Sequence, residues 1–235
     1  MLQVENLNAF YGQSHILHGI NLRVEAGRRT TVLGRNGAGK TTLLKSISNS
    51  GPRVEGRVSY DGREMGQRIW FRRAKDGLAF VPEDRRIFTH ITVEENIELG
   101  RFGASPDRTV IPPAQIYEWF PMLGPLRARL GGQLSGGQQQ MLAVARAVAS
   151  HPKLLLLDEP TEGLAPVIVE DLAKIVAQIC EEQKITLLLV EQNIWFGRQT
   201  TDTVYVFDTG QVVFSGSWAE FDADETIRDR HLAVA

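Results

Sequence analysis

The sequence has 235 residues, of which 43% are hydrophobic and 23% are charged, with a formal net charge of −2. A chain of this length can bury a full core, so we expect a single domain, 1–235. The near-neutral charge gives no overall basic field and argues against nucleic acid as a partner. The chain has no run of about 18 apolar residues that could span a membrane. Its start lacks the pattern of a signal peptide, so we expect a cytoplasmic protein unless partners hold it at a membrane face.

The first part of the chain alternates between apolar and polar residues in the manner of β-strands. Ile20, Leu22 and Val24 are apolar at every second position, and Gly27 ends the run. A short strand at residues 30–33 leads directly into glycines, and residues 41–49 have the apolar spacing of a helix. Further strands are expected at residues 57–60, before an Asp-Gly turn, and at 78–81, before Pro82.

From about residue 92 to residue 150 the pattern becomes helical, with an interruption at Pro106, Pro112 and Pro113. Apolar strands at 154–157 and 185–190 then enclose a helix, and this order implies a right-handed parallel crossover. A hairpin is expected at 204–214. The sequence therefore predicts an α/β fold. Residues 1–91 and 151–235 would form a core with a parallel sheet and an antiparallel β lobe, and residues of about 92–150 would form an inserted helical lobe.

Residues 34–41 match the phosphate-loop pattern G-x-x-x-x-G-K-[ST] at every fixed position, and they lie between a strand and a helix as that pattern requires. Glycines let backbone N–H groups surround phosphate oxygens, and the helix adds the positive end of its dipole. We expect Lys40 to reach the outer phosphates of ATP and the Thr41 hydroxyl to bind Mg²⁺. The residues expected to bind the nucleotide here are Gly34, Arg35, Asn36, Gly37, Ala38, Gly39, Lys40, Thr41 and Thr42.

Two carboxylates, Asp158 and Glu159, follow the strand at 154–157 directly. In open parallel sheets, ligands bind at the carboxyl ends of the strands. A lone Asp-Glu pair would usually be a helix cap or a solvated turn, but a phosphate loop needs a second magnesium ligand, and Asp158 is the natural one. Glu159 can orient and deprotonate the attacking water.

A second glycine motif, Leu-Ser-Gly-Gly-Gln at residues 134–138, opens a helical run at residues 139–149. Its hydroxyl, backbone N–H groups and helix start together suit an anion. One nucleotide needs only one phosphate loop, so this motif would complete a nucleotide held by another copy or by a partner chain. An ordinary Ser-Gly helix start is the alternative. The residues concerned are Ser135, Gly136, Gly137 and Gln138.

With these motifs in this order, the chain resembles the nucleotide-binding subunits of ABC transporters over essentially its whole length. The resemblance implies the ABC ATPase fold, with a P-loop core, and a head-to-tail dimer. Each ATP would lie between the Lys40 loop of one subunit and the Ser135 motif of the other. Tyr11 lies where the family has an aromatic residue that stacks on adenine, although it could also be a core or surface tyrosine.

Four local stretches resemble the ATPases of branched-chain amino acid importers and of their urea or amide relatives. They are residues 81–86, 92–96, 163–166 and 189–193. The resemblance implies uptake of a small polar solute, most often a branched-chain amino acid, through membrane permease subunits supplied by an extracytoplasmic solute-binding protein. The chain would then be peripheral on the inner face of the cell membrane.

Three positions depart from the broad family. Glu83 replaces a glutamine that touches magnesium, and as a carboxylate it can still bind Mg²⁺ directly or through water. Gln192 replaces a histidine that contacts the γ-phosphate; an amide can donate a hydrogen bond but cannot become cationic. Ala165 replaces an aspartate. We therefore expect Glu83 and Gln192 among the catalytic residues and Glu83 among the magnesium ligands.

The departures leave the assembly and the activity open. The second ATPase subunit of the dimer could be an identical copy or, as we favour, a related subunit with the more usual residues. Two other functions also remain open: a soluble ABC-type ATPase that acts on DNA or the ribosome, and a regulatory subunit that does not hydrolyse ATP. The long coiled insertions or basic arms typical of the first are absent from the sequence.

The remaining side chains suggest surface or core positions. Trp195 and Phe196 are expected in the core, and Cys180 is expected to be a buried thiol. Four aromatic residues could be either docking anchors for the permease or the core of the helical lobe: Trp70, Phe71, Trp119 and Phe120. Two basic clusters are expected to be solvated: Arg72, Arg73 and Lys75, and Arg85 and Arg86. The five histidines lack metal-ligand spacing.

Overall fold

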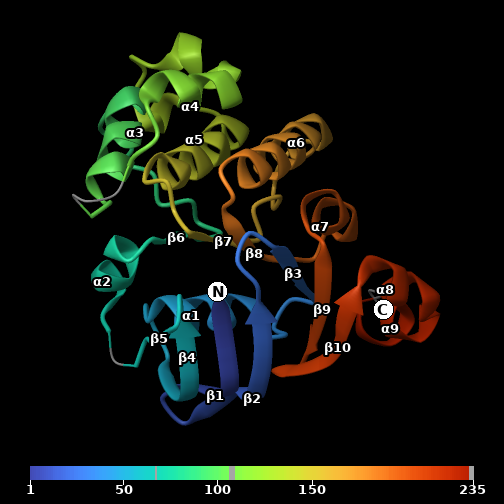
Figure 1. Ribbon diagram of the computed structural model, residues 1–235. Coiled ribbons are helices and arrows are strands. Elements are labelled where there is room, and N and C mark those ends of the chain that lie inside the picture. Colours follow the sequence, from blue (N-terminus) through green and yellow to red (C-terminus); the bar gives the residue numbers. More distant parts are fainter. Residues whose placement is uncertain (67, 106–108, 233–235) are drawn as a thin grey trace.

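The computed structural model describes residues 1–235 except 67, 106–108 and 233–235, so Pro106 lies outside the described residues. Its strands form two sheets (Figure 1). An antiparallel sheet has the order β2-β1-β4-β5, and a second sheet has the order β10-β9-β3-β8-β7-β6. The strands are β1 (Leu2–Tyr11), β2 (Ser14–Val24), β3 (Arg29–Gly34), β4 (Arg53–Tyr60), β5 (Arg63–Glu64), β6 (Leu78–Val81), β7 (Leu154–Asp158), β8 (Thr186–Glu191), β9 (Thr203–Asp208) and β10 (Gln211–Ser217).

The second sheet is parallel except at its edge, where β10 runs antiparallel to β9. The predicted crossover is present: β7 continues through α6 (Pro166–Glu182) to β8, which pairs with β7 in parallel. Every residue of β7 and β8 is buried, as expected for central strands with helices on both faces. The predicted α/β class is confirmed, with a parallel core and an antiparallel β lobe.

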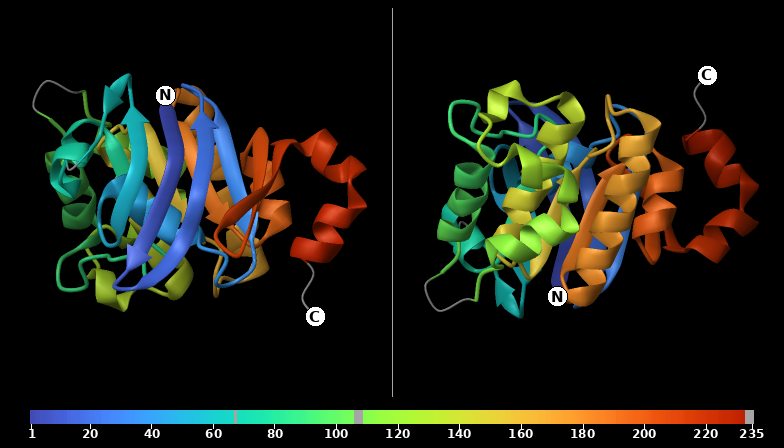
Figure 2. Two further views of the ribbon diagram at one scale, coloured as in Figure 1. Left: turned by 90° about the horizontal axis from the view of Figure 1, so that it is seen from below. Right: turned by 90° about the horizontal axis from the view of Figure 1, so that it is seen from above.

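Alternate residues of β7 enter two different cores, because successive side chains of a strand point to opposite faces. Leu154 and Leu156 pack with α1 (Lys40–Ser48) and the antiparallel sheet. Leu155 and Leu157 pack with the helices of the other face. Helix α1, which follows the phosphate loop, is therefore enclosed between the two sheets. Figure 2 shows the antiparallel sheet on the lower side and the helices on the upper side of the molecule.

Helices cover the upper face of the parallel sheet, and two more lie beside β10 near the carboxyl terminus (Figures 1 and 2). The sequence did not predict α2 or the last two helices. No helix in the described ranges combines the length and the hydropathy needed to cross a membrane. The helices are α2 (Trp70–Lys75), α3 (Val93–Phe102), α4 (Pro113–Trp119), α5 (Gly136–Ala149), α7 (Ile194–Thr200), α8 (Trp218–Ala223) and α9 (Glu225–His231), with 3₁₀ turns at Pro121–Leu126 and Gly131–Gln133.

Some of the aromatic residues considered in the sequence are buried and others are exposed, and one of them, Trp195, differs from its prediction. Trp119 and Phe120 are buried in the core of the helical layer, whereas Trp70 and Phe71 are exposed on α2. The docking alternative is therefore wrong for the first pair. Phe196 is buried as expected, but Trp195 is 45% exposed, so the prediction of a core position for Trp195 is wrong. Adjacent residues on the short helix α7 point in different directions, and only Phe196 faces the sheet. Cys180 is buried, which raises the pKa of its thiol to about 12.

Arg73 is a second correction, because it is almost completely buried rather than solvated. Its guanidinium donates to four carbonyl oxygens, those of Gly66 and Arg68 at 2.8 Å each, Ser46 at 3.5 Å, and Ile47. Ser46 and Ile47 lie in the last turn of α1, where carbonyl groups have no intrahelical partner. Burial, together with the charge of Arg68, lowers the pKa of Arg73 to about 10. Arg73 thus joins α2 to the carboxyl end of α1.

We expect Arg73→Met to lower the free energy of unfolding by about 2–3 kcal/mol, because it leaves buried carbonyl oxygens without a charged donor. Urea denaturation followed by circular dichroism measures this change. The neighbouring exposed residue provides the matched control, since Arg72→Met should change the free energy by less than about 0.5 kcal/mol. Equal midpoints for the two variants would show that Arg73 does not stabilise this junction.

Candidate functional site

The phosphate loop is held in place by strands on both sides. It begins at Gly34, the last residue of β3, and its last residues, Lys40 and Thr41, form the start of α1. Gly39 has a φ of +99°, and a Cβ there would lie 2.7 Å from Leu17 of β2. At Gly34 a Cβ would lie 2.7 Å from the carbonyl oxygen of Phe207 on β9. Only glycine fits at these two positions. Residues with a side chain rarely adopt the backbone conformation of Gly39, and at Gly34 the carbonyl group of Phe207 leaves no room for a Cβ.

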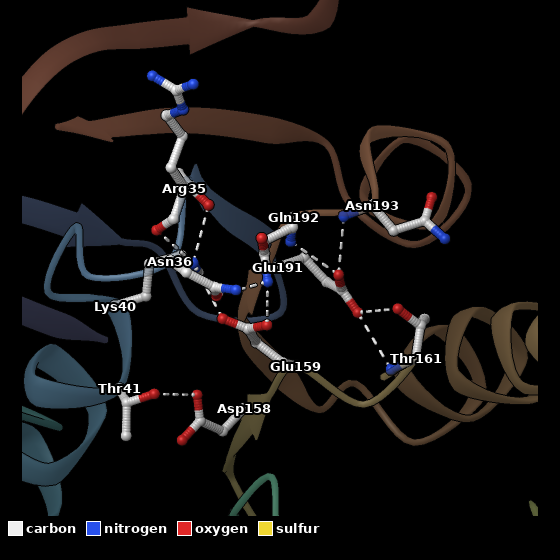
Figure 3. A network of polar contacts seen from close by, with 11 residues as sticks. Arg35, Asn36, Lys40, Thr41, Asp158, Glu159, Thr161, Glu191, Gln192 and Asn193 are labelled. Carbon is white, nitrogen blue, oxygen red and sulfur yellow. Dashed lines mark hydrogen bonds and ion pairs between the residues drawn. The ribbon is translucent and has the colours of Figure 1, made fainter. Parts of the chain in front are cut away.

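Lys40 is buried at the first turn of α1, and its ammonium group lies inside the loop (Figure 3). Its Nζ donates to the carbonyl oxygens of Gly34 at 2.8 Å and Arg35 at 3.0 Å. The same Nζ forms an ion pair with Oε1 of Glu159 at 2.9 Å. The loop after β3 and the carboxylate after β7 are therefore in direct contact, as expected for the carboxyl ends of strands in one parallel sheet.

Glu159 is held from several directions. Its second oxygen, Oε2, accepts a hydrogen bond from Nε2 of Gln192 at 2.6 Å, and the same amide donates to Oδ1 of Asn36 at 2.8 Å. Its backbone N–H donates to the carbonyl oxygen of Val190 at 2.9 Å. Glu159 has a φ of +43°, which is costly for a residue with a side chain and persists only where surrounding bonds fix it. The structure thus brings Lys40, Glu159, Gln192 and the phosphate loop together.

Asp158 contacts the other end of the loop. Its Oδ1 accepts a hydrogen bond from the Thr41 hydroxyl at 2.9 Å, whereas its buried Oδ2 has no hydrogen-bond partner among the described residues. Burial raises the pKa of Asp158 to about 6, the negative charges of Glu159 and Glu83 add to the shift, and the bond from Thr41 opposes it. A buried carboxylate oxygen without a donor beside a threonine hydroxyl fits a hard divalent cation such as Mg²⁺.

Other residues predicted for the site lie around this centre. Glu83 is exposed beyond the end of β6 and close enough to affect the pKa of Asp158. Tyr11 is 43% exposed at the end of β1. Arg35 is exposed, and Figure 3 shows its side chain directed away from Lys40. Ala38 is buried, and its carbonyl oxygen accepts from the N–H of Gly210 at 3.0 Å. The side chain of Thr42 is buried in α1.

The second glycine motif forms the start of α5, three residues earlier than the helix predicted from the sequence. The Ser135 hydroxyl oxygen accepts from the N–H of Gln138 at 3.3 Å, and Oε1 of Gln138 accepts from the N–H of Ser135 at 2.9 Å. This is a capping box, and Ser135 and Gly136 are exposed. In the part of the chain that the structure describes, no hydrogen bond or ion pair links Ser135, Gly136, Gly137 or Gln138 to the phosphate loop.

Two residues that the sequence reasoning missed also belong to this network. The carboxylate of Glu191, at the end of β8, is buried and accepts hydrogen bonds from Thr161, Gln192 and Asn193 (Figure 3). Thr161 lies two residues after Glu159. The sequence did contain a signal for Glu191, because a charged residue directly follows the apolar run 187–190.

The chain was compared with known families, proteins and structures. A family model described as ABC transporter matches residues 17–162. The branched-chain amino acid transport ATP-binding protein BraG of Pseudomonas aeruginosa is 37% identical, with 99% of each chain covered. A probable branched-chain amino acid transport ATP-binding protein LivF of Archaeoglobus fulgidus is 35% identical, with 92% of each covered. A dimeric bacterial ABC transporter cassette of known structure has a TM-score of 0.78 and 25% identity, covering 92% of this chain and 98% of its own.

The family match includes the phosphate loop, the Ser135 motif, and Asp158 and Glu159 at the end of β7. The two relatives exceed 30% identity over nearly the full length of both chains. The chain therefore belongs to the ABC transporter family, as an ATP-binding subunit with the ABC ATPase fold.

Proposed function

We propose that this chain binds MgATP and hydrolyses it to energise uptake of a small polar solute, most plainly a branched-chain amino acid. The observation that carries the hydrolytic part is the direct contact of the phosphate loop with both carboxylates, through the Lys40–Glu159 and Thr41–Asp158 pairs. The solute is supported by the functions named for BraG and LivF. Transport would require membrane permease subunits and, indirectly, an extracytoplasmic solute-binding protein.

In this proposal the loop residues 34–42 bind the triphosphate, and the ammonium group of Lys40 neutralises charge on its outer oxygens. Tyr11 stacks on the adenine. Thr41 and Asp158 hold Mg²⁺, with Glu83 as a further ligand directly or through water. The described residues include no group of three His, Cys, Asp or Glu side chains placed to hold a metal. This agrees with magnesium chemistry, since Mg²⁺ in nucleotide sites takes one or two carboxylates and completes its shell with phosphates and water.

Glu159 is proposed to accept the proton of the attacking water. Its carboxylate is fixed from two sides, by Lys40 on Oε1 and by Gln192 on Oε2. The Gln192 amide also donates to Asn36 in the phosphate loop, so it connects the loop to the Glu159 carboxylate. Because an amide does not titrate, Gln192 can orient groups here but cannot exchange protons. A bound magnesium would stabilise charge on the phosphate oxygens during hydrolysis.

The Ser135 motif has its proposed role in a dimer. Ser135, Gly136, Gly137 and Gln138 would contact the nucleotide that the partner subunit holds on its own loop. The dimeric cassette of the same fold supports such an assembly. We propose a second ATPase subunit as the partner, favouring a related chain over an identical copy because Glu83, Gln192 and Ala165 depart from the family's more usual residues.

The permease is proposed to dock at α2. Ile69, Trp70 and Phe71 form an exposed apolar surface there, with Trp70 62% exposed. Apolar and aromatic residues that remain exposed together mark contact sites for partners. The subunit would then be peripheral on the inner face of the cell membrane. Residues 1–91 and 151–235 would form the nucleotide-binding core, and residues of about 92–150 the helical lobe.

Asp158→Asn should raise the midpoint of thermal unfolding in EDTA, and by more at pH 8 than at pH 5. The pKa of Asp158 is raised from 3.8 to about 6, so folding favours the protonated form. The stability that this group contributes is present below the unfolded-state pKa and is lost as the pH rises through about 6. Asparagine does not titrate and escapes this loss. Scanning calorimetry at both pH values measures the difference.

The control for this comparison is Asp171→Asn, at an exposed position on α6, which should shift the midpoint little at either pH. A gain in the Asp158 variant that is no larger at pH 8 than at pH 5 would show that burial does not disfavour the charged form of Asp158.

Glu159→Gln should keep ATP binding but lower the hydrolysis rate by about 10²-fold or more, because the amide cannot accept the proton of the water. Phosphate release by the purified chain, alone and with its partner subunit, measures the rate, and fluorescence of a labelled nucleotide measures binding. Glu170→Gln, at an exposed position on α6, is the matched control. Tight binding with unchanged turnover would refute the role of Glu159.

Trp70→Ala should weaken binding to the permease subunits about tenfold or more and leave ATP hydrolysis by the isolated chain unchanged. Binding to detergent-solubilised permease on a biosensor measures the effect. Trp195→Ala is the control, since Trp195 is also an exposed tryptophan but lies on α7, which packs against β3 and β8, whereas α2 packs against β6. Equal affinities for the two variants would place the permease elsewhere.

A further inference from the structure

A buried carboxylate connects two loops of the site without touching the phosphate loop. Glu191 is 1% exposed at the end of β8. Its Oε1 accepts from the N–H of Thr161 at 3.2 Å and from the Thr161 hydroxyl at 2.6 Å. Its Oε2 accepts from the N–H groups of Gln192 at 2.8 Å and Asn193 at 2.9 Å. Each oxygen therefore binds one of two chain segments, and Figure 3 shows the carboxylate between them.

The two segments carry the groups that face the phosphate loop. The first runs from Glu159 to Thr161, and the second contains Gln192, whose side chain amide donates to Glu159. A backbone bond from Glu159 to Val190 joins the same segments once more. After Asn193 the chain is again fixed, because the Asn193 side chain accepts from the N–H of Phe196 and caps α7. Glu191 thus lies at the point where both segments leave their strands.

Burying a carboxylate at the end of β8 costs free energy of folding unless hydrogen bonds or ion pairs compensate its charge. Burial raises the pKa of Glu191, and the bonds from Thr161, Asn193 and Gln192 act in the opposite direction. No cation forms an ion pair with it in the described ranges, so the hydrogen bonds alone compensate its charge. Three of the four partners are backbone N–H groups, which can only donate, and the fourth is the Thr161 hydroxyl, which can donate or accept.

The buried carboxylate of Glu191 fixes the positions of Glu159 and Gln192, on which the proposed reaction depends. Glu159 adopts a left-handed backbone conformation that must be enforced by its surroundings. The Gln192 amide contacts Glu159 and Asn36 at once, at 2.6 and 2.8 Å, which leaves little freedom for the backbone that carries it. Small displacements of groups that orient a reactant reduce rates strongly.

We propose that Glu191 is a positioning residue for ATP hydrolysis, which holds the Gln192 amide and the Glu159 carboxylate in register by binding the backbone of both segments. The inference rests on the hydrolytic function proposed above. Glu191 acts through Gln192 and Glu159 and contacts neither nucleotide nor water itself. Its loss should therefore lower kcat more than it changes the KM for ATP.

Glu191→Gln tests this role with almost no change in volume. In either orientation the amide places an NH₂ group against a pair of donors. Toward Thr161 the hydroxyl can rotate and accept, but the backbone N–H cannot; toward Gln192 and Asn193 both partners are backbone N–H groups. We expect kcat for ATP to fall about tenfold or more, with KM changed less than about twofold.

A second variant tests the same role if Glu191→Gln folds poorly. Thr161→Val removes one of the four bonds and should lower kcat in the same direction by a smaller factor. Glu181→Gln, at an exposed position on α6, is the matched control and should retain the kcat of the unchanged chain. Thermal unfolding of each variant is measured in parallel.

The decisive readout is a double-mutant cycle with Gln192→Ala. Because Glu191 acts partly through the amide, adding Glu191→Gln to Gln192→Ala should lower kcat by a smaller factor than Glu191→Gln does in the unchanged chain. Multiplicative losses, or an unfolding midpoint that falls while kcat is retained, would overturn the positioning role in favour of a purely structural one. No hydrolysis by the unchanged chain would overturn the proposed function and this role together, whereas full kcat in Glu191→Gln beside an active unchanged chain would overturn the role alone.

Discussion

The ion pair between Lys40 and Glu159 is the contact on which the arrangement of the site depends. It requires the end of β3 and the end of β7 to lie on the same edge of the sheet, with β8 between them. The parallel order β3-β8-β7 provides this, and right-handed crossovers place the connecting helices on the faces rather than at that edge. The edge remains accessible for three loops, those that carry Lys40, Glu159 and Gln192. Enclosure of α1 between two sheets then fixes the loop that precedes it.

The same edge concentrates negative charge. Asp158, Glu159 and Glu191 are all buried at the ends of β7 and β8 or directly after them, and Lys40 is the cation that an ion pair connects to them in the described part of the chain. Burial raises the pKa of Asp158, and the negative charges of Glu159 and Glu83 add to the shift. Carboxylates brought together in a buried place reduce the stability of the folded chain, and such a cost is typical of sites selected for chemistry rather than for stability. A cation bound beside Thr41 would relieve it.

Much of this site could be predicted because its residues are close together in sequence or follow a strict pattern. The phosphate loop occupies eight consecutive positions, and Asp158 and Glu159 directly follow an apolar strand. Whether an individual charged or aromatic residue is buried was harder to predict from the sequence. Arg72 and Arg73 are adjacent and chemically identical, yet only Arg73 meets the end of α1, and the carbonyl groups that receive it lie over twenty residues earlier in the chain. Trp195 and Phe196 differ in the same way, since the direction of a seven-residue helix decides which one faces the sheet. The role of Glu191 depends on a partner thirty residues away.

The start of α5 shows how a motif can be complete within one chain and still bind another molecule. In its capping box the Ser135 oxygen accepts a hydrogen bond from Gln138, and this leaves the hydroxyl hydrogen free to donate, because no acceptor for it lies among the described residues. Ser135 and Gly136 are exposed, and the positive end of a fourteen-residue helix lies behind them. An anion can therefore bind there without breaking the cap, so the helix needs no rearrangement to meet it. A helix end that is both prearranged and accessible is what the proposed dimer requires of the group that meets the triphosphate of a second subunit.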